Sequence, residues 1–255
     1  MNHSHTPVLS ETFIQRLRRA RHVCVLTGAG VSAESGVPTF RSAGGLWSQY
    51  DPTELATERA FRKDPDLVWS WYSWRRTLIA GVEPNAGHRA LAAFPEVFPR
   101  FSLITQNVDN LHRRAGSPDV HELHGNIEHS RCIACGIPYH DAAAPPTETA
   151  QRCSCGGWIR PGVVWFGESL PEDELRFAQS AAVDCDVFLS VGTSGLVYPA
   201  ADLPRLAHRS GAYTVEINPE PTGLAPSLDE QLPFLSGVVL PAILQTMMDI
   251  RNEGD

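Results

Sequence analysis

The chain contains 255 residues, of which 42% are hydrophobic and 20% are charged. These values are typical of a globular protein with a substantial buried core, and they exclude a disordered or collagen-like chain. Its 21 basic and 29 acidic residues give a net charge of −8. This charge argues against a general nucleic-acid or anionic-membrane binder, because phosphate binding needs an excess of Lys and Arg. No apolar run reaches the roughly 18 residues of a membrane-spanning helix, so we expect neither a membrane nor a nucleic-acid partner.

Apolar runs of strand length alternate with helix-like stretches along the chain. The expected strands are residues 22–27, 101–105, 120–123, 163–166, 185–191 and 212–217. The expected helices are residues 10–21, 65–80, 87–94, 109–115, 171–182, 199–210 and 241–251. Several of the runs are rich in Val, Leu and Ile, as strands covered on both faces must be. The alternation predicts an α/β fold with a doubly wound parallel sheet.

Short loops of small or polar residues follow four of these strands. They begin at Gly28, Gln106, Gly192 and Asn218. Because parallel strands end at one edge of a sheet, where open α/β sheets bind ligands, this layout predicts a dinucleotide site. The segment GAGVSA at 28–33 fits the loose dinucleotide fingerprint, although such a string is also an ordinary tight turn. The acidic residue that a dehydrogenase needs about 20 residues later is missing, which disfavours hydride transfer.

Four of the six cysteines form a paired pattern. They are Cys132, Cys135, Cys153 and Cys155. Four thiolates at this spacing indicate one structural zinc ion with a closed coordination shell, although the second pair has one intervening residue instead of two. The alternatives are free thiols in a loop and a zinc ribbon that grips nucleic acid, which the acidic charge disfavours. Cys24 and Cys185 lie in apolar strands and are expected to be core residues.

Several motifs occur together in a fixed order. They are GAGVSAESGVPTFR at 28–41, TQNVD at 105–109, HG at 124–125, the four cysteines, VVWFGE at 163–168 and GTS at 192–194. Together these motifs resemble the sirtuin family of NAD-dependent protein lysine deacylases. The resemblance implies a Rossmann-like domain with a small zinc-binding module and a helical insertion. It assigns residues 1–40, 84–127 and 161–255 to the large domain, 41–83 to a loop and helical part, and 128–160 to the zinc module.

The resemblance also implies which residues bind NAD. Asn107 and Asp109 would hold the nicotinamide end, Phe40 would cover it, Arg41 would lie near the phosphates, and Gln106 would lie near the ribose. The other implied NAD-binding residues are Gly28, Ala29, Gly30, Ser32, Ala33, Trp47, Gly192, Thr193, Ser194, Asn218 and Ser236.

The expected catalytic residues are His124, Asn107 and Asp109, and His124 is the expected base. An imidazole with a pKa near 6.5 can take a ribose hydroxyl proton at neutral pH and later return it. In sirtuins the nucleophile is the carbonyl oxygen of the substrate amide, which accounts for the lack of an evident catalytic triad in this sequence. The expected products are the free lysine, nicotinamide and O-acyl-ADP-ribose.

Two segments are expected to bind the acylated substrate. By resemblance, Val164, Trp165, Phe166 and Gly167 pair with the substrate backbone as an added strand. A buried strand with Trp165 and Phe166 in the core is an equal alternative for these side chains.

Tyr72 and Arg75 form the expected acyl pocket. They lie three residues apart on an expected helix, so they share one face and could bind a carboxylate. The sirtuin subgroup that removes succinyl and malonyl groups carries this Tyr-x-x-Arg, and Ala33 and the 43–47 segment also look like that subgroup. The alternative is an exposed arginine on a Trp-packed helix.

Two other functions stay open at this stage. One is the enzymatic ADP-ribosylation of proteins, and the other is the binding function of a catalytically silent NAD-sensing zinc adaptor. The expected partners are acylated lysine side chains of proteins or peptides. We expect a cytoplasmic monomer, because the first residues lack the features of a secretory signal and the sequence shows no heptads.

Overall fold

The computed structural model describes residues 7–38, 55–139 and 149–253. The expected NAD-binding residues Phe40, Arg41 and Trp47 lie outside these ranges. None of the helices within them is long and apolar enough to cross a bilayer.

A six-stranded sheet forms the larger part of the molecule, and all of its strand pairs are parallel. Its strands, in spatial order, are β3 (His121–Glu122), β2 (Arg100–Thr105), β1 (His22–Thr27), β7 (Val187–Val191), β8 (Tyr213–Ile217) and β9 (Glu230–Leu232). The order runs outward from β1 on one side and from β7 on the other. The switch point therefore lies between β1 and β7, and the predicted doubly wound fold is confirmed.

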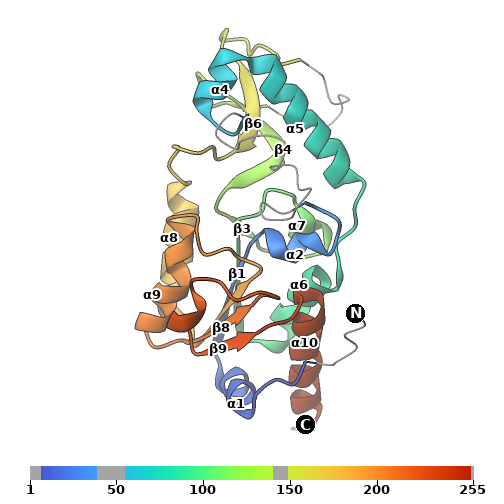
Figure 1. Ribbon diagram of the computed structural model, residues 1–255, viewed down its shortest axis with the longest axis vertical. Helices are drawn as coiled ribbons and strands as arrows, with labels where there is room; N and C mark the ends of the chain where they lie inside the picture. Colours follow the sequence, from blue (N-terminus) through green and yellow to red (C-terminus); the bar gives the residue numbers. More distant parts are fainter. Residues whose placement is uncertain (1–6, 39–54, 140–148, 254–255) are drawn as a thin grey trace.

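Helices cover both faces of this sheet (Figure 1). One side carries α1 (Glu11–Arg19), α6 (Ala86–Val97) and α10 (Ser236–Asn252), and the other carries α8 (Glu172–Asp184) and α9 (Leu203–Arg209). Successive residues of β1 alternate between the two cores: Val23 and Val25 belong to the first, and Cys24 and Leu26 to the second. Cys24 and Cys185 are buried core residues, as the sequence predicts.

A second, three-stranded antiparallel sheet lies at the opposite end of the molecule from α1 (Figure 1). It consists of β5 (Pro138–Tyr139), β4 (Gly125–Cys132) and β6 (Ile159–Val163), in that order. Helices α4 (Glu58–Lys63) and α5 (Pro65–Ala80) pack with β4 and β6 around a separate core that contains Phe61, Tyr72 and Trp165.

The expected strand at 163–166 is wrong in position and in sheet. The strand ends at Val163 and belongs to the antiparallel sheet. The chain then turns: Glu168 N donates to Trp165 O at 3.0 Å, and Gly167 has a φ of +87°, which favours glycine.

Other element boundaries also differ from the expectation. Helix α10 begins at Ser236 with Pro241 inside it, while α7 (Leu111–Arg114) is shorter than predicted. The short helix α2 (Ala29–Ala33) follows β1 at once, and 3-10 turns lie at Ala200–Asp202 and Ala225–Ser227. The domain boundaries expected at 127/128 and 160/161 fall inside β4 and β6.

Gly125 provides a test of how β4 meets β6. Its φ is +74°, and a Cβ there would lie 2.2 Å from Gly162 O, whereas Gly211, with φ +98°, has no atom within 4 Å of such a Cβ. Gly211→Ala should lower the free energy of unfolding by about 1–2 kcal/mol through backbone strain alone. Gly125→Ala should lower it by about 1–3 kcal/mol more, since overpacking is added. Urea unfolding of both variants measures the difference, and equal losses would contradict the close approach.

Candidate active site

The loops after β1 and β7 pack directly on one another. Gly30 N donates to Gly192 O at 2.9 Å, and Gly28 N donates to Val191 O at 2.9 Å. A Cβ on Gly30 would lie 2.6 Å from Gly192 Cα, and Gly192 has a φ of +60°. The sequence analysis places Gly28 and Gly30 in a dinucleotide fingerprint. In the structure, this loop-to-loop contact by itself requires them.

A buried network joins three of the predicted site residues. Ser32 Oγ donates to Asp109 Oδ2 at 2.7 Å, and Asn107 Nδ2 donates to Ser32 Oγ at 3.1 Å and to Gly28 O at 3.0 Å. Burial raises the pKa of Asp109, while its hydrogen bonds from Leu111 N and Ser32 act in the opposite direction. The fold therefore brings together residues from two motifs that lie far apart in the sequence.

His88 extends this network, and the sequence analysis did not identify it. Its Nδ1 accepts from Asn85 N at 3.3 Å in a capping box at the start of α6, so its Nε2–H faces Ser32 Oγ at 3.4 Å. Burial lowers the pKa of His88 to about 4, so the ring is neutral at pH 7. The signal in the sequence that could have identified His88 is its position three residues after Asn85, which is the spacing of a capping box.

His124 lies two residues after the end of β3 and immediately precedes β4. Its Nδ1 lies 2.9 Å from Gln106 O, and because a carbonyl only accepts, Nδ1 carries the hydrogen and Nε2 keeps a lone pair. Val164 N donates to His124 O at 2.8 Å. Burial lowers the pKa of His124, and the bond to the Gln106 carbonyl partly offsets this. The imidazole is thus held in the tautomer that suits a general base.

The segment after β6 uses its N–H groups within the protein. Val164 N donates to His124 O, Trp165 N to Glu168 Oε2, and Phe166 N to Ala56 O. Within the described ranges, no donor reaches the carbonyl oxygens of Val164 and Phe166, and Gly167 N has no acceptor. Trp165 is buried in the small core, whereas Phe166 is 48% exposed.

Tyr72 and Arg75 do share one face of α5. The Arg75 guanidinium carbon lies 5.7 Å from the centre of the Tyr72 ring and 5.0 Å from that of Trp71. Burial lowers the pKa of Arg75, and its attraction to Tyr72 and Asp109 opposes this shift.

The remaining predicted nucleotide-binding residues in the described ranges lie on the same edge. Asn218 Nδ2 donates to Thr193 O at 2.9 Å, linking the loops after β8 and β7. Ser236 is buried, and its Oγ donates to Glu34 Oε1 at 2.8 Å, at the start of α10. Ala29 and Ala33 lie on α2, and Ser194 follows Thr193.

The four predicted zinc ligands come together in space. Their sulfur atoms all lie within 4.8 Å of one another, with 3.5 Å between Cys132 and Cys155 and 3.8 Å between Cys135 and Cys153. Four thiolates around a tetrahedral zinc ion lie about 3.8 Å apart, so this set is suited to one zinc ion. Gly157 N points at Cys155 Sγ at 3.5 Å, and a Cβ on Gly157 would lie 2.7 Å from Cys132 Sγ. The glycine therefore lets the shorter second pair close.

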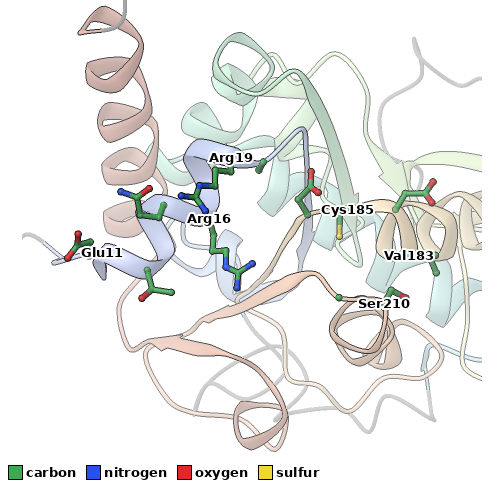
Figure 2. Close-up of a pocket in the computed structure, with 12 residues that line it drawn as sticks. Glu11, Arg16, Arg19, Val183, Cys185 and Ser210 are labelled. Atoms are coloured by element: carbon green, nitrogen blue, oxygen red, sulfur yellow. The ribbon is translucent and has the colours of Figure 1, made fainter.

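A pocket of about 780 Å³ lies away from this site (Figure 2). Its lining includes Arg16, Arg19, Cys185 and Ser210. Arg16 and Arg19 lie on α1, and Cys185 and Ser210 lie just before the amino ends of β7 and β8, whereas the predicted site residues gather at the carboxyl ends of the strands. The pocket is therefore separate from the candidate site.

Metal analysis tests the zinc assignment. Cys135→Ser should lower the zinc content well below the single ion expected per chain and should lower the unfolding temperature, because a structural zinc site contributes directly to folding. Cys185→Ser is the matched control, since Cys185 lies in the large core, and it should keep its zinc. Elemental analysis and thermal unfolding read the two effects. Full zinc content in the Cys135 variant would contradict the assignment.

Comparison with known proteins places this arrangement in a family. A model of the Sir2 family matches residues 28–199. NAD-dependent protein deacylase 1 of Pseudomonas aeruginosa is 51% identical over 241 residues, covering 91% of this chain and 96% of the relative. The NAD-dependent protein deacylase of Aquifex aeolicus is 54% identical over 209 residues, covering 82% and 87%. The crystal structure of a Sir2 homolog–NAD complex has a TM-score of 0.90 and 42% identity, and covers 97% of both chains. The chain belongs to the Sir2 family, whose members are also called sirtuins.

Proposed function

We propose that this chain is an NAD-dependent protein-lysine deacylase that prefers succinyl and malonyl groups over acetyl groups. The observation that carries the activity is the convergence of His124, Asn107 and Asp109 at the carboxyl edge of the parallel sheet, beside the Gly28–Gly192 contact. The relatives named NAD-dependent protein deacylases support it, because they align over most of the chain.

The nucleotide would lie along the loops after β1, β2, β7 and β8. Asn107 and Asp109 would hold the nicotinamide end, and Gln106 would lie near the ribose. The residues proposed for the rest of the nucleotide are Gly28, Ala29, Gly30, Ser32, Ala33, Phe40, Arg41, Trp47, Gly192, Thr193, Ser194, Asn218 and Ser236. The already paired side chains of Asn218 and Ser236 would serve mainly by shaping these loops.

In this proposal the acylated lysine supplies the attacking atom. Its amide oxygen displaces nicotinamide from the ribose of NAD, so the protein has to position the two substrates and exclude water. His124 Nε2 would take the proton of a ribose hydroxyl, whose oxygen then attacks the former amide carbon. A water molecule that enters after nicotinamide has left would supply the new carbonyl oxygen of the acyl group, so that the lysine amine leaves and the acyl group stays on the ribose. The Gln106 carbonyl accepts from His124 Nδ1–H, so the lone pair is on Nε2 before the proton is taken.

Peptide binding would use the open backbone groups of Val164, Phe166 and Gly167. Main-chain pairing gives affinity with little dependence on peptide sequence. The Trp165 side chain is in the core, so its part in binding would be limited to its backbone. A cytoplasmic location and a monomeric state stay predictions.

The acyl preference rests on Arg75 and Tyr72. A guanidinium and a phenol on one helix face can bind a carboxylate, which succinyl and malonyl groups have and an acetyl group lacks. Burial lowers the pKa of the half-buried Arg75, and a carboxylate beside the guanidinium would favour its charged form.

One assay tests the proposed activity. The protein is incubated with NAD and a succinyl-lysine peptide, and nicotinamide release and peptide mass are measured. Nicotinamide release that depends on the peptide, with loss of the acyl mass, supports deacylation. ADP-ribose on protein would indicate a transferase instead, and no NAD consumption would indicate a binding protein.

His124 is expected to act as a neutral base. His124→Ala should lower kcat/KM by about 10²–10⁴-fold with the fold retained, since general base catalysis contributes this much. In the wild type, activity should fall as pH drops through the pKa of His124, which burial holds below 6.5. The profile of kcat/KM against pH, with circular dichroism of the variant, measures both. An acid limb centred above 6.5, or a fully active variant, would contradict the role.

Arg75 is expected to select the acyl group. Arg75→Met should weaken succinyl-lysine turnover relative to acetyl-lysine turnover by about 2–5 kcal/mol, as for a buried charge pair that loses one partner. Arg75→Lys is the control that keeps a positive charge and should retain part of the preference. Values of kcat/KM for the succinyl-lysine and acetyl-lysine peptides test whether Arg75 selects the acyl group. An equal loss of kcat/KM on both peptides would count against the proposed acyl pocket.

A further inference from the structure

One hydrogen bond connects the peptide-pairing segment to the acyl pocket. Trp165 Nε1 donates to Tyr72 Oη at 3.0 Å. Both side chains are almost completely buried, at 1% and 2% exposed, in the core of the small domain. The two residues are 93 positions apart in the sequence, and the motifs that contain them gave no sign of this contact.

This bond controls where the Tyr72 hydroxyl hydrogen points. A phenol oxygen can accept one hydrogen bond and donate another. Because the Tyr72 oxygen accepts from the indole N–H, its own hydrogen must point in a different direction. Burial raises the pKa of Tyr72, so the hydrogen stays in place at neutral pH. Within residues 7–38, 55–139 and 149–253, no acceptor takes this hydrogen. A buried donor in this state is complementary to an incoming acceptor.

Trp165 is itself fixed by several contacts. Its backbone N–H donates to Glu168 Oε2 at 2.8 Å, and the Arg160 guanidinium carbon lies 3.3 Å from the centre of its ring. Arg160 is 2% exposed, is paired with both carboxylate oxygens of Glu168, and also donates to Val163 O at 2.8 Å. Phe61 covers the ring from another side, with centroids 5.2 Å apart. The indole N–H therefore has one orientation available to it.

We propose that Trp165 is a positioning residue of the acyl pocket, whose indole N–H turns the Tyr72 hydroxyl toward the carboxylate of a negatively charged acyl group. The inference rests on the proposed acyl preference. Arg75 supplies the positive charge over the Tyr72 ring, and Trp165 sets the direction in which the neutral Tyr72 hydroxyl donates. An acetyl group has no carboxylate to receive this hydrogen, so it gains nothing from the arrangement.

Trp165→Phe tests the proposal, because it removes the N–H and keeps an aromatic ring against Phe61 and Arg160. The ratio of kcat/KM for succinyl-lysine over acetyl-lysine peptides should fall about fivefold to tenfold, mainly through the KM of the succinyl peptide. Trp158→Phe is the matched control, since Trp158 packs on Arg152 in the zinc module and has no bond to Tyr72. It should leave the ratio unchanged. Thermal unfolding of each variant verifies the fold.

A double-mutant cycle separates positioning from general packing. Tyr72→Phe should lower the ratio by itself, and adding Trp165→Phe to it should lower the ratio no further, because Trp165 acts through the phenol oxygen. Equal losses on both peptides in Trp165→Phe, or an undiminished selective loss in the Tyr72→Phe background, would overturn the proposal. A wild type without acyl preference would overturn the pocket as well. A preference that Arg75→Met removes and Trp165→Phe leaves intact would overturn only the role of Trp165.

Discussion

The two sheets of the molecule meet at His124 and Gly125, and the candidate site depends on that junction. His124 bonds the loop after β2 through its ring and the segment after β6 through its carbonyl, and Gly125 begins β4 against β6. One of these bonds, between His124 Nδ1 and Gln106 O, also fixes the tautomer of the proposed base. Because β4 runs from Gly125 to the zinc ligand Cys132, the cysteine cluster anchors the far end of the strand that starts beside the base.

Four residues behind the site, Ser32, His88, Asn107 and Asp109, are buried and joined by hydrogen bonds. Ser32 links Asp109 and Asn107, and His88 faces it from α6 as a neutral ring. An unpaired polar atom here would cost about 1–3 kcal/mol, so this pairing holds the loops after β1 and β2 in one arrangement. Burial raises the pKa of Asp109, and the nearby charge of Arg75 on α5 acts in the opposite direction.

Strands β1, β2, β7 and β8 were predictable because they are largely buried, so each one appears in the sequence as a short apolar run. The edge strand β9 was not predicted, because its partly exposed residues Glu230–Leu232 carry no such signal. The meeting of residues 28, 107 and 192 followed from one geometric rule, since parallel strands end at a common edge. The zinc ligands were predictable from spacing, because two close pairs of thiols have few other uses.

Other features depend on contacts that the sequence does not reveal. Strand β4 has an irregular burial pattern and a register shift against β6, so it lacks the alternation that predicts a strand. Trp165 and Phe166 are neighbours with opposite environments because the chain leaves the sheet at Val163 and turns. The partner of Ser236, Glu34, is 202 residues away, and only the fold brings the two together.

In the proposed reaction, the substrate's own amide oxygen displaces nicotinamide. The protein positions the two substrates and deprotonates a ribose hydroxyl. The most direct measurement follows heavy oxygen placed in the acyl carbonyl of a succinyl-lysine peptide through a single turnover with NAD. The account predicts that the label is found on the ribose of the nucleotide product, with one nicotinamide released for each acyl group lost. Label confined to free succinate, or acyl loss without NAD, would contradict it.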